Sequence, residues 1–243
     1  MEVAVGVHRL TGGVVNFYLI EDGGKLVLVD AGAPGDWKLL VQTITGLGLR
    51  LQDLDAVLIT HAHADHTGFA ERARTATSAR VWIHEADVDQ ASGGKAPRND
   101  GKMSRYLAKA EMYRTLISLL RRRALSIVPI RNLSSFGDGE VVDVPGRPRV
   151  VHAPGHTAGT AALYIESRGI LFSGDALVTH NPLTGRVGPQ IMPSGFNRDS
   201  VEALTSLRAL LTVAATTVLP GHGEPWTGGA AEAVRLARQA GIS

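Results

Sequence analysis

The sequence predicts an αββα sandwich, in which two β-sheets pack face to face and helices cover the outside. Two observations support this prediction. Short apolar runs rich in β-branched residues recur in both halves of the chain, and segments with helical apolar spacing follow them in each half. A chain of 243 residues can also bury a large core without cross-links. We expect one domain over residues 1–243, with a helical insertion at about 86–126.

The first half of the chain alternates between strand and helix patterns. Residues 14–20 and 25–32 are rich in β-branched and aliphatic residues, and the turn sequence "EDGG" separates them, which predicts a β-hairpin. The pattern then predicts a helix, a buried strand, a second helix and a second strand, at residues 35–48, 55–60, 69–77 and 79–84.

The insertion has a different pattern. A polar loop with glycine and proline precedes residues 103–125, whose spacing predicts one long helix. The expected apolar stripe of this helix comprises Leu107, Ala110, Leu116, Leu119 and Leu120. For its methionines and tyrosines, a core or cap position is favoured over a place beside a substrate cleft. For the basic run Arg121, Arg122 and Arg123, a solvated helix end is favoured over an anion-binding role.

The second half repeats the same alternation. Five short strands are expected, at residues 126–130, 140–144, 149–155, 160–167 and 169–175. A helix, a strand and a final helix follow, at residues 197–211, 216–221 and 228–241. Asn197 or Asp199 is expected to cap the first of these helices.

Composition excludes several classes of protein. The chain has no cysteine, which excludes disulfides, thiolate metal ligands and a cysteine nucleophile. A net charge of +2 is too small to favour a nucleic-acid partner. There is no signal-peptide pattern and no run of about 18 apolar residues. We therefore expect a cytoplasmic protein with no membrane partner, whose oligomeric state the sequence does not indicate.

The stretch "HAHADH" contains four residues that commonly bind metals: His61, His63, Asp65 and His66. The side chains of His61 and His63 are two positions apart and point the same way on an extended segment, so both can reach one ion. Asp65 and His66 follow where the chain turns, and can reach a second ion. Imidazole and carboxylate ligands without sulfur suit zinc, manganese or iron. Two such ions about 3.5–4 Å apart are the usual arrangement for metal-assisted hydrolysis.

Three further turns each place an ionisable residue beside glycine at the end of a predicted strand. They are "APGHTAG" with His156, "FSGDAL" with Asp175 and "LPGHGE" with His222. Functional residues favour loops that a rigid sheet holds in place. These three residues are therefore candidates for the missing ligands.

Together with Asp30 in "LVDAG", these motifs resemble the five-part pattern of the metallo-β-lactamase-fold hydrolase superfamily, from residue 30 to residue 222. The resemblance implies an αββα fold that binds two divalent metal ions, zinc before iron or manganese, at one edge between the sheets. It implies that Asp30 orients the ligands and that Asp175 bridges both ions. The remaining implied ligands are His61, His63 and His156 for the first ion, and Asp65, His66 and His222 for the second.

The resemblance also implies an enzyme that cleaves an ester, thioester, lactone or amide of a small substrate with a metal-bridging hydroxide. Asp65 would orient the hydroxide and carry a proton to the leaving group. An iron-dependent thiol or persulfide oxidoreductase on the same fold remains an alternative. β-Lactam cleavage is expected only as a minor activity, because lactamases of this family generally have cysteine or serine where Asp175 stands.

The irregular segment 178–196 is a candidate wall of the cleft, since a long loop in a compact domain is often functional. Its candidate substrate contacts are His180, Ile191, Met192 and Phe196. A loop that simply packs on its own side chains is the alternative.

Overall fold

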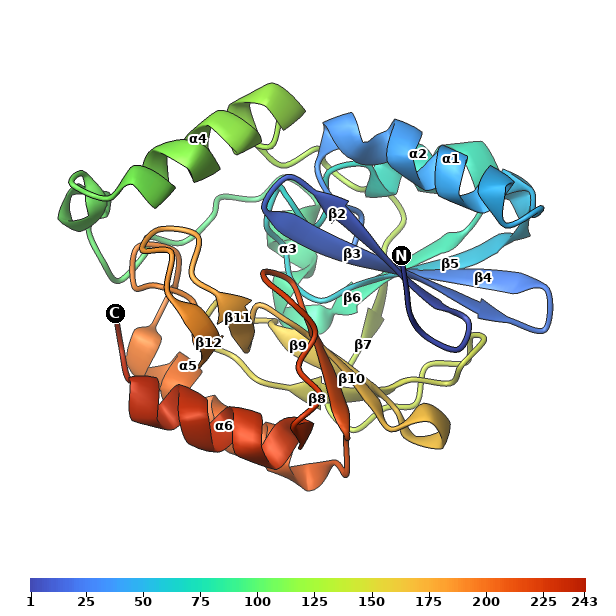
Figure 1. Cartoon of the computed structure of the whole chain (residues 1–243). Helices are drawn as coiled ribbons and strands as arrows, with labels where there is room; N and C mark the ends of the chain where they lie inside the picture. The colour runs from blue at the N-terminus through green and yellow to red at the C-terminus, as the bar shows by residue number, and fades with distance from the viewer.

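A computed structural model describes all 243 residues, and Figure 1 shows four layers, with a helix layer outside each of two packed sheets. The first sheet has seven strands in the order β1-β2-β3-β4-β5-β6-β7. Their bounds are β1 Glu2–Ala4, β2 Val7–Gly12, β3 Val15–Asp22, β4 Lys25–Val29, β5 Leu54–Ile59, β6 Arg80–His84 and β7 Ser134–Phe136. The second sheet has the order β13-β10-β9-β8. Its strands are β8 Arg149–His152, β9 Ala161–Ile165, β10 Ile170–Gly174 and β13 Thr217–Pro220.

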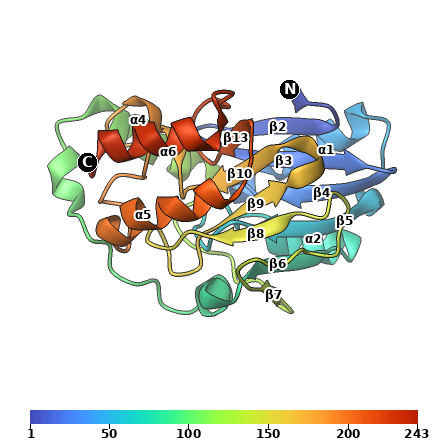
Figure 2. The ribbon, with the colours of Figure 1, turned by 90° about the horizontal axis from the view of Figure 1, so that it is seen from below.

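A small third sheet pairs β11 Val178–His180 with β12 Val187–Gln190. The helices are α1 Trp37–Gly46, α2 Ala70–Thr77, α3 Val88–Ala91, α4 Ala110–Arg122, α5 Ser200–Ser206 and α6 Gly229–Ala240. Figure 2 shows α5 and α6 on the same side of the molecule, and the 3₁₀ segment Leu207–Thr212 that follows α5 packs against α6. No helix has both the length and the apolar character needed to cross a bilayer.

Three apolar clusters correspond to the three boundaries between the layers. Leu40 of α1 and Phe69, just before α2, pack against the outer face of the seven-stranded sheet. Tyr18 and Phe172 belong to the cluster between the two sheets, where their rings meet edge to face at 5.3 Å. Val234 of α6 packs on the outer face of the second sheet. The αββα sandwich is therefore confirmed.

Strands β4, β5, β6 and β7 run parallel, and β5 is buried on both faces. Parallel strands covered on both sides are typically continuous apolar runs, which is why "DAVLIT" shows no alternation of polar and apolar residues. The predicted hairpin is also present, as β3 and β4 pair antiparallel. The buried strand and the hairpin could both be predicted, because strand positions that are buried require apolar residues.

The insertion differs from its prediction. Residues 103–125 form a short 3₁₀ turn, Met103–Tyr106, and then α4, because the backbone at Lys109 is extended. The expected stripe does not face the core: Leu107, Leu116 and Leu120 are exposed by 56%, 43% and 51%, as the side chains of Met112 and Thr115 face inward instead. A polar contact fixes this orientation, since the Thr115 hydroxyl donates to the carbonyl of Pro182.

Two other predicted strands are absent. Residues 126–130 form no strand, and residues 140–144 contribute only an isolated bridge between Val141 and Arg149. The helix expected at 197–211 is divided into α5 and the 3₁₀ segment Leu207–Thr212. Ile130, Val142 and Val144 are buried in the apolar clusters between the layers although they form no regular strand. A short apolar run does not distinguish this state from a strand.

We expect Phe172→Ala to lower the free energy of unfolding by about 3–5 kcal/mol, because it opens a cavity between the two sheets. Phe172 is 1% exposed. Phe172→Leu should cost clearly less, since it keeps most of the buried volume. Urea denaturation of both variants measures the free energy of unfolding. Equal decreases for the two variants would contradict the packing of Phe172 between the sheets.

Candidate metal centre

The candidate ligands come together at one edge of the sandwich, beyond the ends of four strands. His61, His63, Asp65 and His66 follow β5, His156 follows β8, Asp175 follows β10, and His222 follows β13. Strands β10 and β13 are parallel, and Gly174 pairs with Pro220 at their ends. Their turns therefore leave the sheet together, which brings the side chains of Asp175 and His222 into contact.

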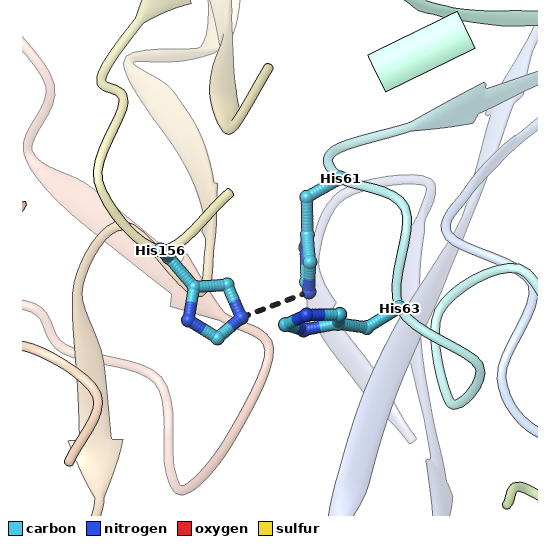
Figure 3. A group of neighbouring side chains, drawn as sticks. All are labelled: His61, His63 and His156. Carbon is cyan, nitrogen blue, oxygen red and sulfur yellow. Dashed lines mark hydrogen bonds between the residues drawn. The ribbon is translucent and has the colours of Figure 1, made fainter. Parts of the chain in front are cut away.

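The ligand atoms form three overlapping groups, within each of which all atoms lie within 4.8 Å of one another. The groups are His61–His63–His156, His61–His66–Asp175 and Asp65–His66–His222. Figure 3 shows the three imidazoles of the first group directed at one another, with the Nε2 atoms of His61 and His156 3.2 Å apart.

The carboxylate of Asp175 lies between the two outer groups. Its Oδ2 atom is 3.4 Å from Nε2 of His156 and 3.2 Å from Nε2 of His222. Its Oδ1 atom is 3.6 Å from Nε2 of His66. One carboxylate therefore faces both halves of the cluster, as a bridging ligand must.

The hydrogen bonding of this cluster is incomplete, which supports a cation site. Nε2 of His66, Nε2 of His222 and Oδ1 of Asp175 are buried and have no hydrogen-bond partner. Buried polar atoms without partners are rare and destabilising, so each needs an explanation. A divalent cation would satisfy all three, and histidine with carboxylate is a donor set that zinc, iron and manganese accept. The residues present fit such ions.

Four of the imidazoles are held through their Nδ1 atoms, which leaves Nε2 facing the centre. Nδ1 of His66 donates to Asp30, at 2.8 Å, and Nδ1 of His222 donates to the carbonyl of Val14, at 2.7 Å. The hydroxyl of Thr60 and the amide oxygen of Asn197 accept from Nδ1 of His61 and of His156, both at 3.0 Å. Such partners fix the tautomer and the ring orientation of metal-binding histidines.

Asp30 also accepts bonds from the backbone N–H and the hydroxyl of Thr60. It is 2% exposed and has a φ of 61°, a conformation that is uncommon outside glycine. Strained backbone of this kind persists where the surrounding contacts determine it, often at functional sites. The orienting role expected for Asp30 is thus consistent with its contacts.

Asp87 is a site residue that the sequence reasoning missed. Its buried carboxylate accepts the backbone N–H of Ala62, the hydroxyl of Thr157 and the backbone N–H of Gly159. It therefore ties the loop carrying His61 and His63 to the loop carrying His156. The only signal in the sequence is an aspartate shortly after a buried strand, in "IHEAD".

Asn197 is the second missed residue, since the sequence suggested it only as a helix cap. Asp199 is the N-cap of α5, and its side chain accepts the N–H of Glu202. The amide of Asn197 instead joins Nδ1 of His156 to the carbonyl of Met192.

The first group of imidazoles favours the neutral state. Burial disfavours the charged form and holds the pKa of His61 and of His63 below the usual value for histidine. The pKa of His156 falls to about 3 for the same reason. These rings are uncharged at neutral pH, which is the form that binds a metal.

In the second group, the histidines favour the protonated state. Burial lowers the pKa of His66, but the carboxylates of Asp175, Asp30 and Asp65 outweigh it and raise the pKa to about 10. Burial also lowers the pKa of His222, which Asp175 raises above its usual value. Burial raises the pKa of Asp175, but the charges of His222 and His66 hold it well below its usual range. A cation entering this group must displace protons, so its binding is favoured at higher pH.

A cavity of about 340 Å³ opens onto these residues. Its floor is formed by the side chains of the candidate ligands, and its walls come from the insertion and from segment 178–196. The principal wall residues are Ala96, Pro97, Asn99, Thr115, Leu119, Ala124, Pro182, Met192 and Phe196. Helix α4 therefore borders the cleft through Thr115 and Leu119, while Tyr106 and Met112 are buried in a small apolar cluster, as the favoured interpretation of these side chains predicted.

Of the four candidate substrate contacts, Met192 and Phe196 line this cavity, and Ile191 and His180 do not. Ile191 is buried in the core beneath the helices, because neighbouring side chains on an extended segment point to opposite sides. His180 lines a separate hollow with Trp226, and its Nε2 atom lies 3.8 Å from Glu111. These two residues therefore lie outside the cavity beside the candidate ligands.

Known proteins are similar to this chain along most of its length. A family model described as the metallo-beta-lactamase superfamily matches residues 10–222. A probable metallo-hydrolase of Bacillus subtilis, YflN, is 28% identical over 93% of this chain and 87% of its own. The human acyl-coenzyme A thioesterase MBLAC2 is 27% identical over 69% of this chain and 60% of its own. A solved metallo-beta-lactamase family protein of Thermus thermophilus, TTHA1429, is 27% identical with a TM-score of 0.69, over 98% of this chain and 80% of its own.

We expect Asp87→Asn to weaken zinc binding by about 10- to 100-fold without unfolding the protein. The amide replaces an acceptor oxygen by an N–H donor, which cannot accept the donors that Asp87 now binds. Competition titration with a chromogenic chelator measures the affinity. Asp89→Asn is the matched control, because Asp89 is exposed two residues further on and makes no side-chain hydrogen bond. Equal affinity in both variants would contradict the role of Asp87.

Proposed function

This chain belongs to the metallo-beta-lactamase superfamily, and from that premise we propose that it is a two-metal hydrolase of small acyl substrates. The observation that carries the proposal is the set of buried, partnerless atoms on His66, Asp175 and His222. Asp175 and His222 line the cavity, and bound divalent cations would satisfy all three atoms together.

We assign the ligands by the three groups of donor atoms. His61, His63 and His156 would hold one ion, and Asp65, His66 and His222 the other. Asp175 would bind both, because its oxygens lie 3.2 to 3.6 Å from imidazoles of the two groups. Zinc is the first choice for a site with four or more histidines, with iron or manganese as alternatives.

Bound divalent ions would supply Lewis acidity toward an acyl oxygen and lower the pKa of water toward about 7. The protein contributes orientation and proton handling. Asp65 is the ligand-group carboxylate most open to the cavity, with its side chain 19% exposed, against 2% for Asp175. Asp65 is therefore the group placed to accept a proton from water and to pass it to a leaving group in the cavity.

The cavity walls favour an acyl group over a polar one. Leu119, Met192 and Phe196 give one side an apolar surface, while the ligands make the floor polar. This combination suits a substrate with an apolar chain and a reactive carbonyl. The similarity to an acyl-coenzyme A thioesterase supports a thioester as the first substrate class, before esters, lactones and amides.

The decisive experiment is a panel of acyl thioesters, lactones and β-lactams, assayed with protein reconstituted with zinc. We expect two zinc ions per chain, fastest turnover of thioesters, and loss of activity on chelation. Asp175→Asn should lower kcat/KM by about 100-fold or more, since it removes the shared carboxylate. His8→Ala is the matched control, because it removes an imidazole of β2 that belongs to none of the three ligand groups.

Metal analysis of the protein as purified distinguishes the hydrolase from an iron-dependent oxidoreductase. Iron together with oxygen consumption on a thiol or persulfide, and no hydrolysis in the panel, would replace the hydrolase by an oxidoreductase. Full activity of Asp175→Asn would contradict the proposed ligands.

We also expect Phe196→Ala to reduce selectivity for long acyl chains. Loss of one aromatic wall should lower kcat/KM by about 10-fold for long chains and much less for acetyl, because a short chain does not reach the ring. Val187→Ala, at an exposed position, is the control. An equal loss for all chain lengths, measured by steady-state kinetics, would show that Phe196 supports the fold rather than the substrate.

A further inference from the structure

Helix α4 turns an apolar face to the solvent. Tyr113, Leu116, Ile117 and Leu120 are spaced as neighbours on one side of a helix, and they are exposed by 43% to 51%. Figure 1 shows α4 at the periphery of the molecule, away from the helix layer of α1 and α2. This face is therefore uncovered by any part of the chain.

The exposure is concentrated in one segment. Fifteen large apolar side chains are exposed in the whole protein, and eight of them lie between Met103 and Val128. They are Met103, Leu107, Tyr113, Leu116, Ile117, Leu120, Leu125 and Val128. Single exposed apolar residues are ordinary, but a concentration of this kind marks an interaction surface.

An excess of positive charge overlaps this segment. Residues 95–125 contain nine basic and two acidic side chains, a net charge of +7, whereas the whole chain has +2 and the remainder therefore −5. Only two of these cations have an acidic partner: Arg114 pairs with Glu111, and Arg122 pairs with Asp36. The other seven are exposed without a salt bridge: Lys95, Arg98, Lys102, Arg105, Lys109, Arg121 and Arg123.

The outward orientation of the apolar face is fixed by polar contacts on the opposite side of α4. The hydroxyl of Thr115 donates a hydrogen bond to the carbonyl of Pro182, and the guanidinium of Arg122 binds the buried carboxylate of Asp36. The helix thus attaches to the body of the protein partly through polar groups, and its leucines and isoleucine remain outside.

We propose that α4 and its basic flanks bind the surface of an anionic phospholipid bilayer. A helix with one apolar face and flanking lysines and arginines lies in the plane of such an interface, and anionic headgroups attract the cations. This is a surface contact by a helix too short to span, and it differs from the expectation of no membrane partner.

A second copy of the chain suits this face less well. A symmetric dimer through α4 would bring the same patch of each copy together, and so two segments of charge +7. Like charges at that density oppose association, whereas an anionic surface is complementary to them.

The apolar face and the cavity lie on different sides of α4. Thr115 and Leu119 of the same helix, and Ala124 just beyond it, line the cavity, so docking through the exposed face would leave this lining turned toward the protein. The proposal goes beyond the hydrolase reaction, and binding to vesicles can be measured without any substrate.

The test is flotation of the full-length protein with two kinds of vesicle, one of phosphatidylcholine alone and one with about one-third phosphatidylglycerol. We expect at least about tenfold stronger partition onto the anionic vesicles, and weaker binding as salt rises from about 50 to about 500 mM. No binding to anionic vesicles at low salt would overturn the proposal.

Two variants measure separately how much the apolar face and the positive charge contribute to vesicle binding. Leu116→Gln/Ile117→Gln/Leu120→Gln should weaken partition by about tenfold or more, and Arg105→Gln/Arg121→Gln should weaken it by several-fold. The matched controls change exposed residues elsewhere: Val187→Gln/Val201→Gln/Leu211→Gln for the apolar face, and Arg208→Gln/Arg238→Gln for the charge. Both controls should bind as the unchanged protein does.

Two results would contradict the proposed binding to a bilayer surface. Unchanged partition of the triple apolar variant would show that α4 does not enter the interface. Sedimentation showing a dimer that this variant dissociates, with no vesicle binding by the unchanged protein, would assign the face to a second copy of the chain.

Discussion

The structure depends on burying a set of histidine and aspartate side chains that cannot satisfy one another. His61, His66, His156, Asp175 and His222 are each at most 2% exposed, yet several of their polar atoms have no partner. Burial of this kind is unfavourable, so the sandwich around it must supply the compensating stability. The two packed sheets and two helix layers do so at a distance from the cavity, and they leave the strand ends free to carry chemistry.

Two buried carboxylates, Asp30 and Asp87, organise this cluster without belonging to it. Asp30 binds Thr60, just after β5, and the ring of His66, while Asp87 links the loop that carries His61 and His63 to the loop that carries His156. Each accepts hydrogen bonds from three donor groups, and those of Asp87 come from two segments far apart in the sequence. Rigid supports of this kind keep ligands in position before an ion arrives, which lowers the reorganisation that binding requires.

The candidate ligands could be predicted from sequence because each follows an apolar strand, either within "HAHADH" or at a turn beside glycine, and the strand order then brings these segments together. Asp87 and Asn197 could not, because their importance depends on partners about 25 to 70 residues away that no local pattern marks. The direction in which the apolar stripe of α4 faces could not be predicted for a related reason. Periodicity identifies an apolar face, but contacts such as that of Thr115 with Pro182 decide which way the face turns.

The ligand groups draw on both halves of the chain: His61, His63, Asp65 and His66 follow the first sheet, and His156, Asp175 and His222 the second. An ion bound there would cross-link the two sheets, and its binding free energy would add to the free energy of unfolding of the whole sandwich. The lifetime of the folded protein would then follow the supply of metal. When metal is scarce, this edge would be the first to open, and the protein would become a substrate for proteolysis before its core unfolds.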